Sequence, residues 1–179
     1  QIYRNPQKSW CYPLAHDAPV GENTAMNDAP QRTSAVAAIW ERARSGDLRG
    51  GAEAARDALA HSQPALTPAS RIELHLVAAF CAMRQGQHAD ALRELATADH
   101  EAMLAASDAR LPLRIETWRA ELAYFQGRYS EADDIVVRLV DPLEQRGDWA
   151  YAAFALRIRI AILLAHTDYA GVASLSGRA

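Results

Sequence analysis

Short helix-breaking segments recur along this 179-residue chain at a nearly constant interval. They read Ser-Gly-Asp, Gln-Gly-Gln, Gln-Gly-Arg and His-Thr-Asp, and successive central residues, which are Gly46, Gly86, Gly127 and Thr167, are separated by 40, 41 and 40 residues. From Thr33 onward the sequence between the breaks is rich in alanine, and its apolar residues recur three and four positions apart, as on one face of an α-helix. This period indicates a chain built from similar helical units.

The residues that follow each break are also similar in type. A bulky residue stands two positions after each central residue, and at the three glycine breaks a small residue stands five positions after it, as Tyr129 and Ala132 do after Gly127. After Thr167 the fifth position is taken by Val172, so the match is imperfect there. Glycine can take the left-handed conformation that ends a helix, the bulky residue can fill the hairpin, and the small residue lets two helices approach closely. Each unit is therefore predicted to be an antiparallel helix pair whose apolar face is covered by the next pair.

The pattern predicts eight helices, and local capping signals agree with their positions. Thr67 is predicted to be an N-cap, Ser130 with Asp133 resembles a capping box, and Asp148 is predicted to cap the helix that follows Gly147. The expected helices lie at about 33–45, 48–62, 68–85, 88–105, 112–126, 130–146 and 148–166, with an eighth that begins near residue 169.

The first part of the chain differs in composition from the rest. Residues 1–31 hold four of the eight prolines and show no sustained helical period. They are predicted to be an irregular leader or, since Met26 resembles a natural start, a tag-derived segment. Residues 32–179 are predicted to form one helical repeat domain, with units at about 33–66, 67–107 and 110–147 and an incomplete unit at 148–179.

The third unit resembles the tetratricopeptide repeat, whose second half reads G-x-Y-x-x-A-x-x-x-F-x-x-A. The matching residues are Gly127, Tyr129, Ala132, Val136 and Leu139. The resemblance extends over about residues 33–179, in a long form of about 40 residues per repeat that is similar to segments of bacterial signalling proteins. It implies an all-α fold, a right-handed α-solenoid of antiparallel helix pairs, and a scaffold for protein–protein interaction.

The resemblance also implies a binding surface, which such arrays place on the first helix of each pair. The family's inward positions correspond here to Val36, Trp40 and Arg44, then Leu76, Phe80, Met83 and Arg84, then Arg114, Thr117, Glu121, Tyr124 and Phe125, and finally Phe154, Arg157 and Leu164. We expect the partner to contact Trp40, Arg44, Phe80, Met83, Arg84, Arg114, Glu121, Tyr124, Phe125 and Arg157. A core role for Trp40, Phe80 and Phe154 stays open.

Aromatic and arginine side chains on this surface indicate what kind of partner it would bind. Aromatic rings bury a large area, and an arginine can hold a carboxylate with two hydrogen bonds. The expected partner is therefore a protein or peptide of acidic character, in an extended or helical conformation. If so, alanine at Arg84 and Arg114 should weaken binding without lowering the melting temperature.

Neither composition nor motifs indicate catalysis or nucleic-acid binding. The formal net charge of −3 provides no overall positive field for a polyanion. Cys11 and Cys81 are far apart, and no pair of histidines has the spacing of a helical zinc site. A phosphate-binding loop and a nucleophile elbow are also absent from the sequence. We expect no enzymatic activity, no metal and no cofactor.

The most apolar stretch, residues 149–166, carries Arg157 and Arg159 near its centre. Two arginines there would be costly in a lipid bilayer, so we expect a buried helix and no membrane contact. The cysteine content and the lack of a targeting signal favour the cytoplasm.

Three classes of function remain open. The leading one is an interaction scaffold that forms the N-terminal regulatory segment of a longer bacterial signalling protein, such as a transcriptional regulator or a diguanylate cyclase. The alternatives are a small-ligand sensor that holds an effector in the concave groove, and a structural dimerisation module whose groove is filled by the leader or by a second copy. The last helix pair is expected to leave an uncovered apolar face, which further sequence or a homodimer would cover.

Overall fold

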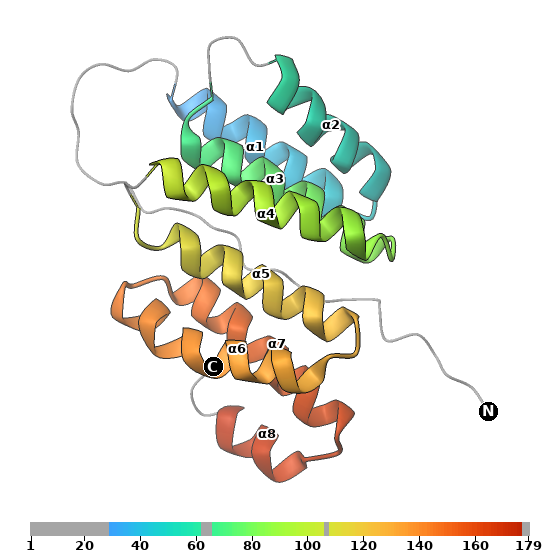
Figure 1. The fold of residues 1–179 in the computed structure, drawn as a ribbon, viewed down its shortest axis with the longest axis vertical. Coiled ribbons are helices and arrows are strands. Elements are labelled where there is room, and N and C mark those ends of the chain that lie inside the picture. Colours follow the sequence, from blue (N-terminus) through green and yellow to red (C-terminus); the bar gives the residue numbers. More distant parts are fainter. Residues whose placement is uncertain (1–28, 62–65, 106–107, 177–179) are drawn as a thin grey trace.

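The chain is described from a computed structural model, in which the described residues are 29–61, 66–105 and 108–176 (Figure 1). Within these ranges the secondary structure consists of α-helices joined by short turns. The helices are α1 (Ala29–Arg44), α2 (Leu48–His61), α3 (Pro68–Arg84), α4 (His88–Ala105), α5 (Leu111–Phe125), α6 (Tyr129–Gln145), α7 (Trp149–Ala165) and α8 (Tyr169–Ser176). The all-α fold predicted from the sequence is confirmed for this part of the chain.

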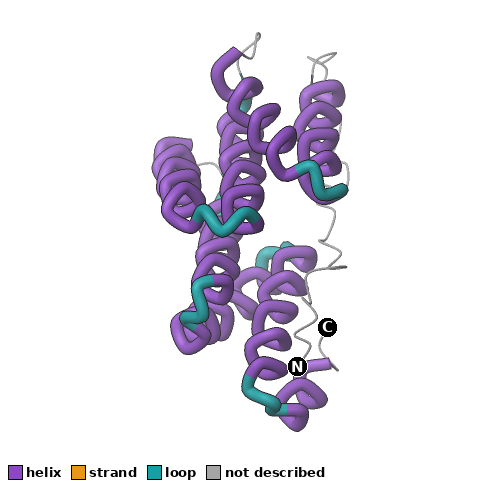
Figure 2. Tube along the Cα trace, turned by 90° about the vertical axis from the view of Figure 1, so that its right-hand side faces the viewer, coloured by secondary structure: helices purple, strands orange, loops and turns teal. Residues whose placement is uncertain are grey.

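Successive helices pack mostly as antiparallel neighbours, stacked along the long axis of the molecule (Figures 1 and 2). The odd-numbered helices also contact one another, α1 with α3, α3 with α5, and α5 with α7. Among the described residues, the even-numbered helices contact only their neighbours in the sequence. The odd-numbered helices therefore form the continuous layer of the structure, and side chains from distant parts of the sequence can meet on that layer.

The turns that end α1, α3, α5 and α7 lie at the four breaks found in the sequence. Gly46, Gly86 and Gly127 have φ values of 104°, 74° and 73°, and Thr167 takes the same left-handed conformation with a φ of 59°. Gly147, between α6 and α7, has a φ of 69°. Since only glycine adopts this conformation readily, Thr167 is the exception in an otherwise regular series.

The same pair of hydrogen bonds closes several of these turns. After α3, the amide of Gln87 donates to the carbonyl of Ala82 at 2.8 Å, and the amide of Gly86 donates to Met83 at 3.0 Å. After α7, the amide of Asp168 donates to the carbonyl of Leu163 at 2.9 Å in the corresponding place. This is the Schellman arrangement, which satisfies carbonyls that the helix end would otherwise leave unpaired.

The helix boundaries agree with those predicted, to within one residue, except at the start of α1. That helix begins at Ala29 instead of residue 33, and it includes Pro30 in its first turn. Proline is tolerated there because the first amides of a helix have no partner within the helix. The rest of the predicted leader lies outside the described residues.

Of the predicted caps, only Thr67 is confirmed, since its hydroxyl accepts a hydrogen bond from the Ser70 amide at 3.1 Å. The capping box at Ser130 is wrong, because α6 begins one residue earlier and makes no side-chain cap bond. Asp148 precedes α7 but makes no cap bond either. Its carboxylate is used in a contact with α5 that is described below.

Small residues allow the helices of a pair to approach closely, as predicted. Gly51, Ala91 and Ala132 are all buried. A Cβ atom added at Gly51 would lie 2.9 Å from the Cβ of Ala43, which is closer than such atoms come in proteins. The absence of a side chain at Gly51 therefore allows α1 and α2 to approach closely.

The two arginines of the apolar helix α7 are both paired with acids. Arg159 Nε lies 3.0 Å from Asp133 Oδ1 on α6, and Arg157 Nη2 lies 2.9 Å from Glu121 Oε1 on α5. No helix in the described part of the chain combines the length and the apolar character needed to span a membrane.

Candidate functional site

The ten predicted site residues all lie on the odd-numbered helices, although they differ in exposure. The buried ones are Trp40, Phe80, Met83, Arg114 and Glu121, and the partly exposed ones are Arg44, Arg84, Tyr124, Phe125 and Arg157. The structure therefore divides the predicted surface into an internal set and an accessible set.

Four aromatic rings form the centre of the internal set, and we call them the aromatic cluster. They are Trp40 on α1, Phe80 on α3, Trp118 on α5 and Phe154 on α7, and each is exposed by 7% or less. The ring centroids of Trp40 and Phe80 are 5.8 Å apart, those of Phe80 and Trp118 are 6.0 Å apart, and those of Trp118 and Phe154 are 4.8 Å apart. Trp40, Phe80 and Phe154, for which the sequence left a core role open, are therefore core residues.

One contact in the aromatic cluster joins helices that do not themselves touch. The rings of Trp40 and Trp118 are stacked, with centroids 5.7 Å apart and an interplanar angle of 20°, although α1 and α5 share no backbone contact. The two side chains meet beside Phe80 of the intervening helix α3. The middle of the odd-helix layer is thus filled by the protein's own rings.

Trp118 was not among the predicted site residues. It follows Phe80 by 38 residues and precedes Phe154 by 36, so a comparison of large aromatics at near-repeat spacing could have found it.

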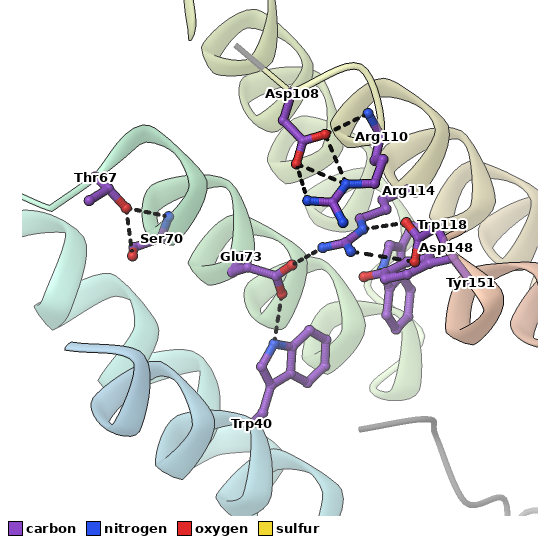
Figure 3. Close-up of polar contacts among 10 residues, drawn as sticks. All are labelled: Trp40, Thr67, Ser70, Glu73, Asp108, Arg110, Arg114, Trp118, Asp148 and Tyr151. Carbon is purple, nitrogen blue, oxygen red and sulfur yellow. Dashed lines mark hydrogen bonds and ion pairs between the residues drawn. The ribbon is translucent and has the colours of Figure 1, made fainter. Parts of the chain in front are cut away.

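A set of buried and partly buried charges lies beside the aromatic cluster (Figure 3). Arg114 Nε donates to Asp148 Oδ2 at 2.7 Å, and Arg114 Nη1 lies 3.7 Å from Glu73 Oε1. The indole Nε1 of Trp40 donates to Glu73 Oε2 at 3.1 Å. These contacts connect α1, α3 and α5 with the start of α7, and they explain why the carboxylate of Asp148 does not cap that helix.

Arg114 stays charged in its buried position and is paired with Asp148 and Glu73. Burial, the largest single influence, lowers its pKa, but the hydrogen bond that Arg114 donates to Asp148 and the electrostatic influence of Tyr151, Asp148 and Glu73 outweigh burial, so the pKa is raised. Burial also raises the pKa of Tyr151, whose hydroxyl accepts a hydrogen bond from Trp118 Nε1 at 3.4 Å. Since Arg114 is a structural ion-pair partner, its replacement by alanine should lower stability, contrary to the expectation from the sequence.

Glu121 and Arg157 form a second ion pair within the odd-helix layer. Glu121 is 2% exposed, and one of its oxygens accepts a hydrogen bond from Arg157 Nη2 at 2.9 Å. The Arg157 guanidinium also lies 4.8 Å from the ring centroid of Phe154. These two predicted site residues therefore bind each other, and they join α5 to α7.

Apart from Arg157, the accessible part of the predicted surface lies at the carboxyl-terminal ends of α1, α3 and α5, and we call this part the arginine rim. It consists of Arg44, Arg84, Tyr124 and Phe125, which are partly exposed. The Arg44 guanidinium lies 4.8 Å from the ring of Trp40, and that of Arg84 lies 5.9 Å from the ring of Phe125. A cation at a helix carboxyl terminus is favoured by the helix dipole, and a ring face restricts its orientation.

The arginine rim has the chemistry of a surface that recognises carboxylates. Arg44 and Arg84 are 40 residues apart, and each stands in the last turn of an odd-numbered helix. Each guanidinium carries several N–H donors in a planar fork that matches a carboxylate. Tyr124 and Phe125, with ring centroids 5.8 Å apart, add apolar surface beside Arg84.

A cavity of about 380 Å³ lies elsewhere, between α2 and α4, and none of the predicted site residues lines it. Its lining residues include Ala78 and Ala82 of α3, together with arginines and acids of α2 and α4. Several of these charges are paired locally, as in Arg49 with Glu53 at 3.0 Å. The cavity therefore gives no support to a small-ligand site at the predicted residues.

Large apolar side chains are exposed on both α7 and α8. Leu164 is 42% exposed and Tyr169 is 69% exposed.

In the described ranges, no group of three or more histidine, cysteine, aspartate or glutamate residues is arranged to hold a metal ion. Comparison of the chain with protein-family models, with curated proteins and with solved structures finds no match.

Proposed function

We propose that this chain is a non-catalytic scaffold for protein–protein interaction, built as a right-handed α-solenoid of antiparallel helix pairs like that of tetratricopeptide repeats. Two observations support the architecture: the same left-handed turn recurs about every 40 residues, and the odd-numbered helices are in continuous contact. A stack of this kind offers a long surface for a partner.

In this proposal the partner is an acidic, extended segment of a protein, and it binds at the arginine rim. The observation that carries the proposal is the placement of Arg44 and Arg84, one repeat apart, each over an aromatic ring at a partly exposed helix end. Arginine and aromatic residues dominate the energy of many interfaces, because they combine charged hydrogen bonds with a large buried area.

The resemblance to bacterial signalling proteins suggests the biological setting. We propose that the chain acts in the cytoplasm as the N-terminal regulatory segment of a transcriptional regulator or a diguanylate cyclase. The reading frame that continues past Ala179 tests this part separately. A DNA-binding or cyclase domain encoded there would support it, and a stop codon directly after Ala179 would contradict it.

The binding proposal is tested by fluorescence anisotropy with a labelled peptide rich in aspartate and glutamate. Replacing both Arg44 and Arg84 with alanine is expected to weaken binding by about tenfold or more, because two interface arginines are lost. Binding to the unaltered protein should also weaken steeply as salt is raised.

The matched control is Arg138→Ala, which removes an exposed arginine from the even-numbered helix α6. It should leave the affinity unchanged. Equal affinities for the unaltered protein and the Arg44/Arg84 double variant would contradict the proposal, as would equally tight binding of a lysine-rich peptide of the same length.

A further inference from the structure

The chain carries an acidic segment of its own immediately before α1. Residues 17–28 contain Asp17, Glu22 and Asp28 and no lysine, arginine or histidine. We propose that this segment is an intramolecular ligand of the arginine rim, which an external acidic partner must displace. The inference rests on the proposed function of the rim, and it adds a means of regulating it.

Charge complementarity is the first argument for this occupant. The segment lies outside the described residues, and it is joined to α1 at Ala29. Two of its three acids, Asp17 and Glu22, are far enough from Ala29 to face the rim, whereas Asp28 is joined directly to the start of α1. The rim presents Arg44 and Arg84 to these two carboxylates. Pro19 and Gly21 disfavour a helix at these positions.

The length of the connecting chain is the second argument. Arg44 lies about 22 Å along α1 from Ala29, because a helix rises about 1.5 Å per residue. Glu22 is seven residues and Asp17 is twelve residues before Ala29. At about 3.3 Å per extended residue, they can reach about 23 Å and about 40 Å from it. Neighbouring helix axes are about 10 Å apart, so Asp17 can also reach Arg84 on α3.

Covalent attachment makes even a weak contact effective. A ligand held by a short linker has an effective concentration on the order of millimolar. If the segment occupies the rim for most of the time, only a small fraction of the molecules has an open rim. The apparent affinity for an external ligand is then the intrinsic affinity multiplied by that fraction. Only partners that are more acidic, or more abundant, than the chain's own segment would then bind.

A paramagnetic label on Cys11 tests the intramolecular contact without any external ligand. Cys81 is fully buried and burial raises the pKa of its thiol to about 11, so labelling at neutral pH is selective for Cys11. We expect broadening of the amide signals in the last turns of α1, α3 and α5, and none around Arg138. The double variant Asp17→Asn/Glu22→Gln should lose this broadening. Broadening that is absent, or that is unchanged in the double variant, would overturn the inference.

Peptide affinity separates this inference from the proposed function. The Asp17→Asn/Glu22→Gln variant is expected to bind the acidic peptide about threefold to tenfold more tightly than the unaltered chain, whereas Asn23→Ala/Thr24→Ala, in the same segment, should not. If both variants bind like the unaltered chain while Arg44→Ala/Arg84→Ala weakens binding, the inference fails and the proposed function stands. If the arginine substitutions have no effect, the proposed function fails.

Discussion

Thr167 occupies a backbone conformation that glycine takes at each of the comparable turns. Its φ of 59° brings the Cβ close to backbone atoms, at a cost of about 1–2 kcal/mol for a residue that is not glycine. The hydroxyl of Thr167 donates to the carbonyl of His166 at 2.6 Å, which recovers a small part of that cost. The turn between α7 and α8 is therefore the most strained member of the series.

We predict that Thr167→Gly stabilises the protein by about 0.5–1 kcal/mol, because relief of the left-handed strain exceeds the extra chain entropy of glycine. Urea denaturation followed by circular dichroism measures this difference. The reverse change at an equivalent turn, Gly127→Thr, should destabilise the protein. A loss of stability in Thr167→Gly would show that strain at this turn is unimportant.

Residue-scale chemistry explains which parts of the structure could be predicted from the sequence. Helix ends were placed to within one residue at nearly every boundary because glycine, capping residues and apolar spacing act within a few positions along the chain. Asp148 shows where such local rules fail. It has the position of a helix cap, but its carboxylate binds Arg114, which is 34 residues away. Only tertiary packing brings these two together.

The candidate site could also be predicted only in part from the sequence. The repeat pattern identified Arg44 and Arg84 at corresponding helix ends. It could not show that Arg114 and Glu121 would be buried in ion pairs, because that depends on which side chains face them from other helices. Nor could it show that Trp118 would stack on Trp40.

At the scale of whole helices, buried ion pairs connect α5 with α7. We predict that Arg114→Ala destabilises the protein by about 3–5 kcal/mol, because it leaves the carboxylate of Asp148 buried without its cation. The double variant Arg114→Met/Asp148→Leu should lose less than the sum of the two single changes, since neither charge is then isolated. Urea titrations of the unaltered protein, Arg114→Met, Asp148→Leu and the double variant give the coupling energy. If the losses of stability in the two single variants add up to the loss in the double variant, Arg114 and Asp148 have no coupling energy.

The contact between α3 and α4 is expected to make stability depend on pH. Arg71 donates to Glu101, with Nη2 2.6 Å from Oε1, and this hydrogen bond lowers the pKa of Glu101. The folded pKa is below the unfolded value, which is about 4.3 for glutamate. The pair therefore contributes its full stability above that pH and loses it as the pH falls through the lowered pKa.

We predict that Glu101→Gln reduces stability by up to about 1 kcal/mol at pH 7, since the pair is partly exposed. The difference from the unaltered protein should shrink below about pH 4. Thermal denaturation across pH 3 to 7 is the measurement. A difference that stays constant over this range would exclude the carboxylate as its source.

At the scale of the whole molecule, the aromatic cluster connects all four odd-numbered helices. A stack of helix pairs held only by neighbouring contacts can unfold in parts. A contact between helices that are not neighbours, such as that of Trp40 on α1 with Trp118 on α5, makes such partial unfolding less favourable. Unfolding of either helix would remove packing from the other.

We predict that the unaltered protein unfolds in one cooperative transition, whereas Trp118→Ala destabilises it by about 3–5 kcal/mol and separates the unfolding of the two halves. Differential scanning calorimetry, compared with the helical signal in circular dichroism, shows whether the transitions coincide. Phe154→Leu, which keeps an apolar side chain at the edge of the cluster, should weaken the protein without splitting the transition. A single transition in Trp118→Ala would show that the cluster does not couple the halves.

The stacking of Trp40 on Trp118 also restricts how this protein could have changed in length. Repeat arrays commonly grow or shrink by duplication or loss of a single unit, because each unit meets only its neighbours. Here a helix pair inserted after α2 or α4 would move the two indoles apart, and deletion of α3 and α4 would remove Phe80 from between them. Helices α1 to α6 should therefore be inherited as one block, with any gain or loss of a helix pair confined to the region beyond α6.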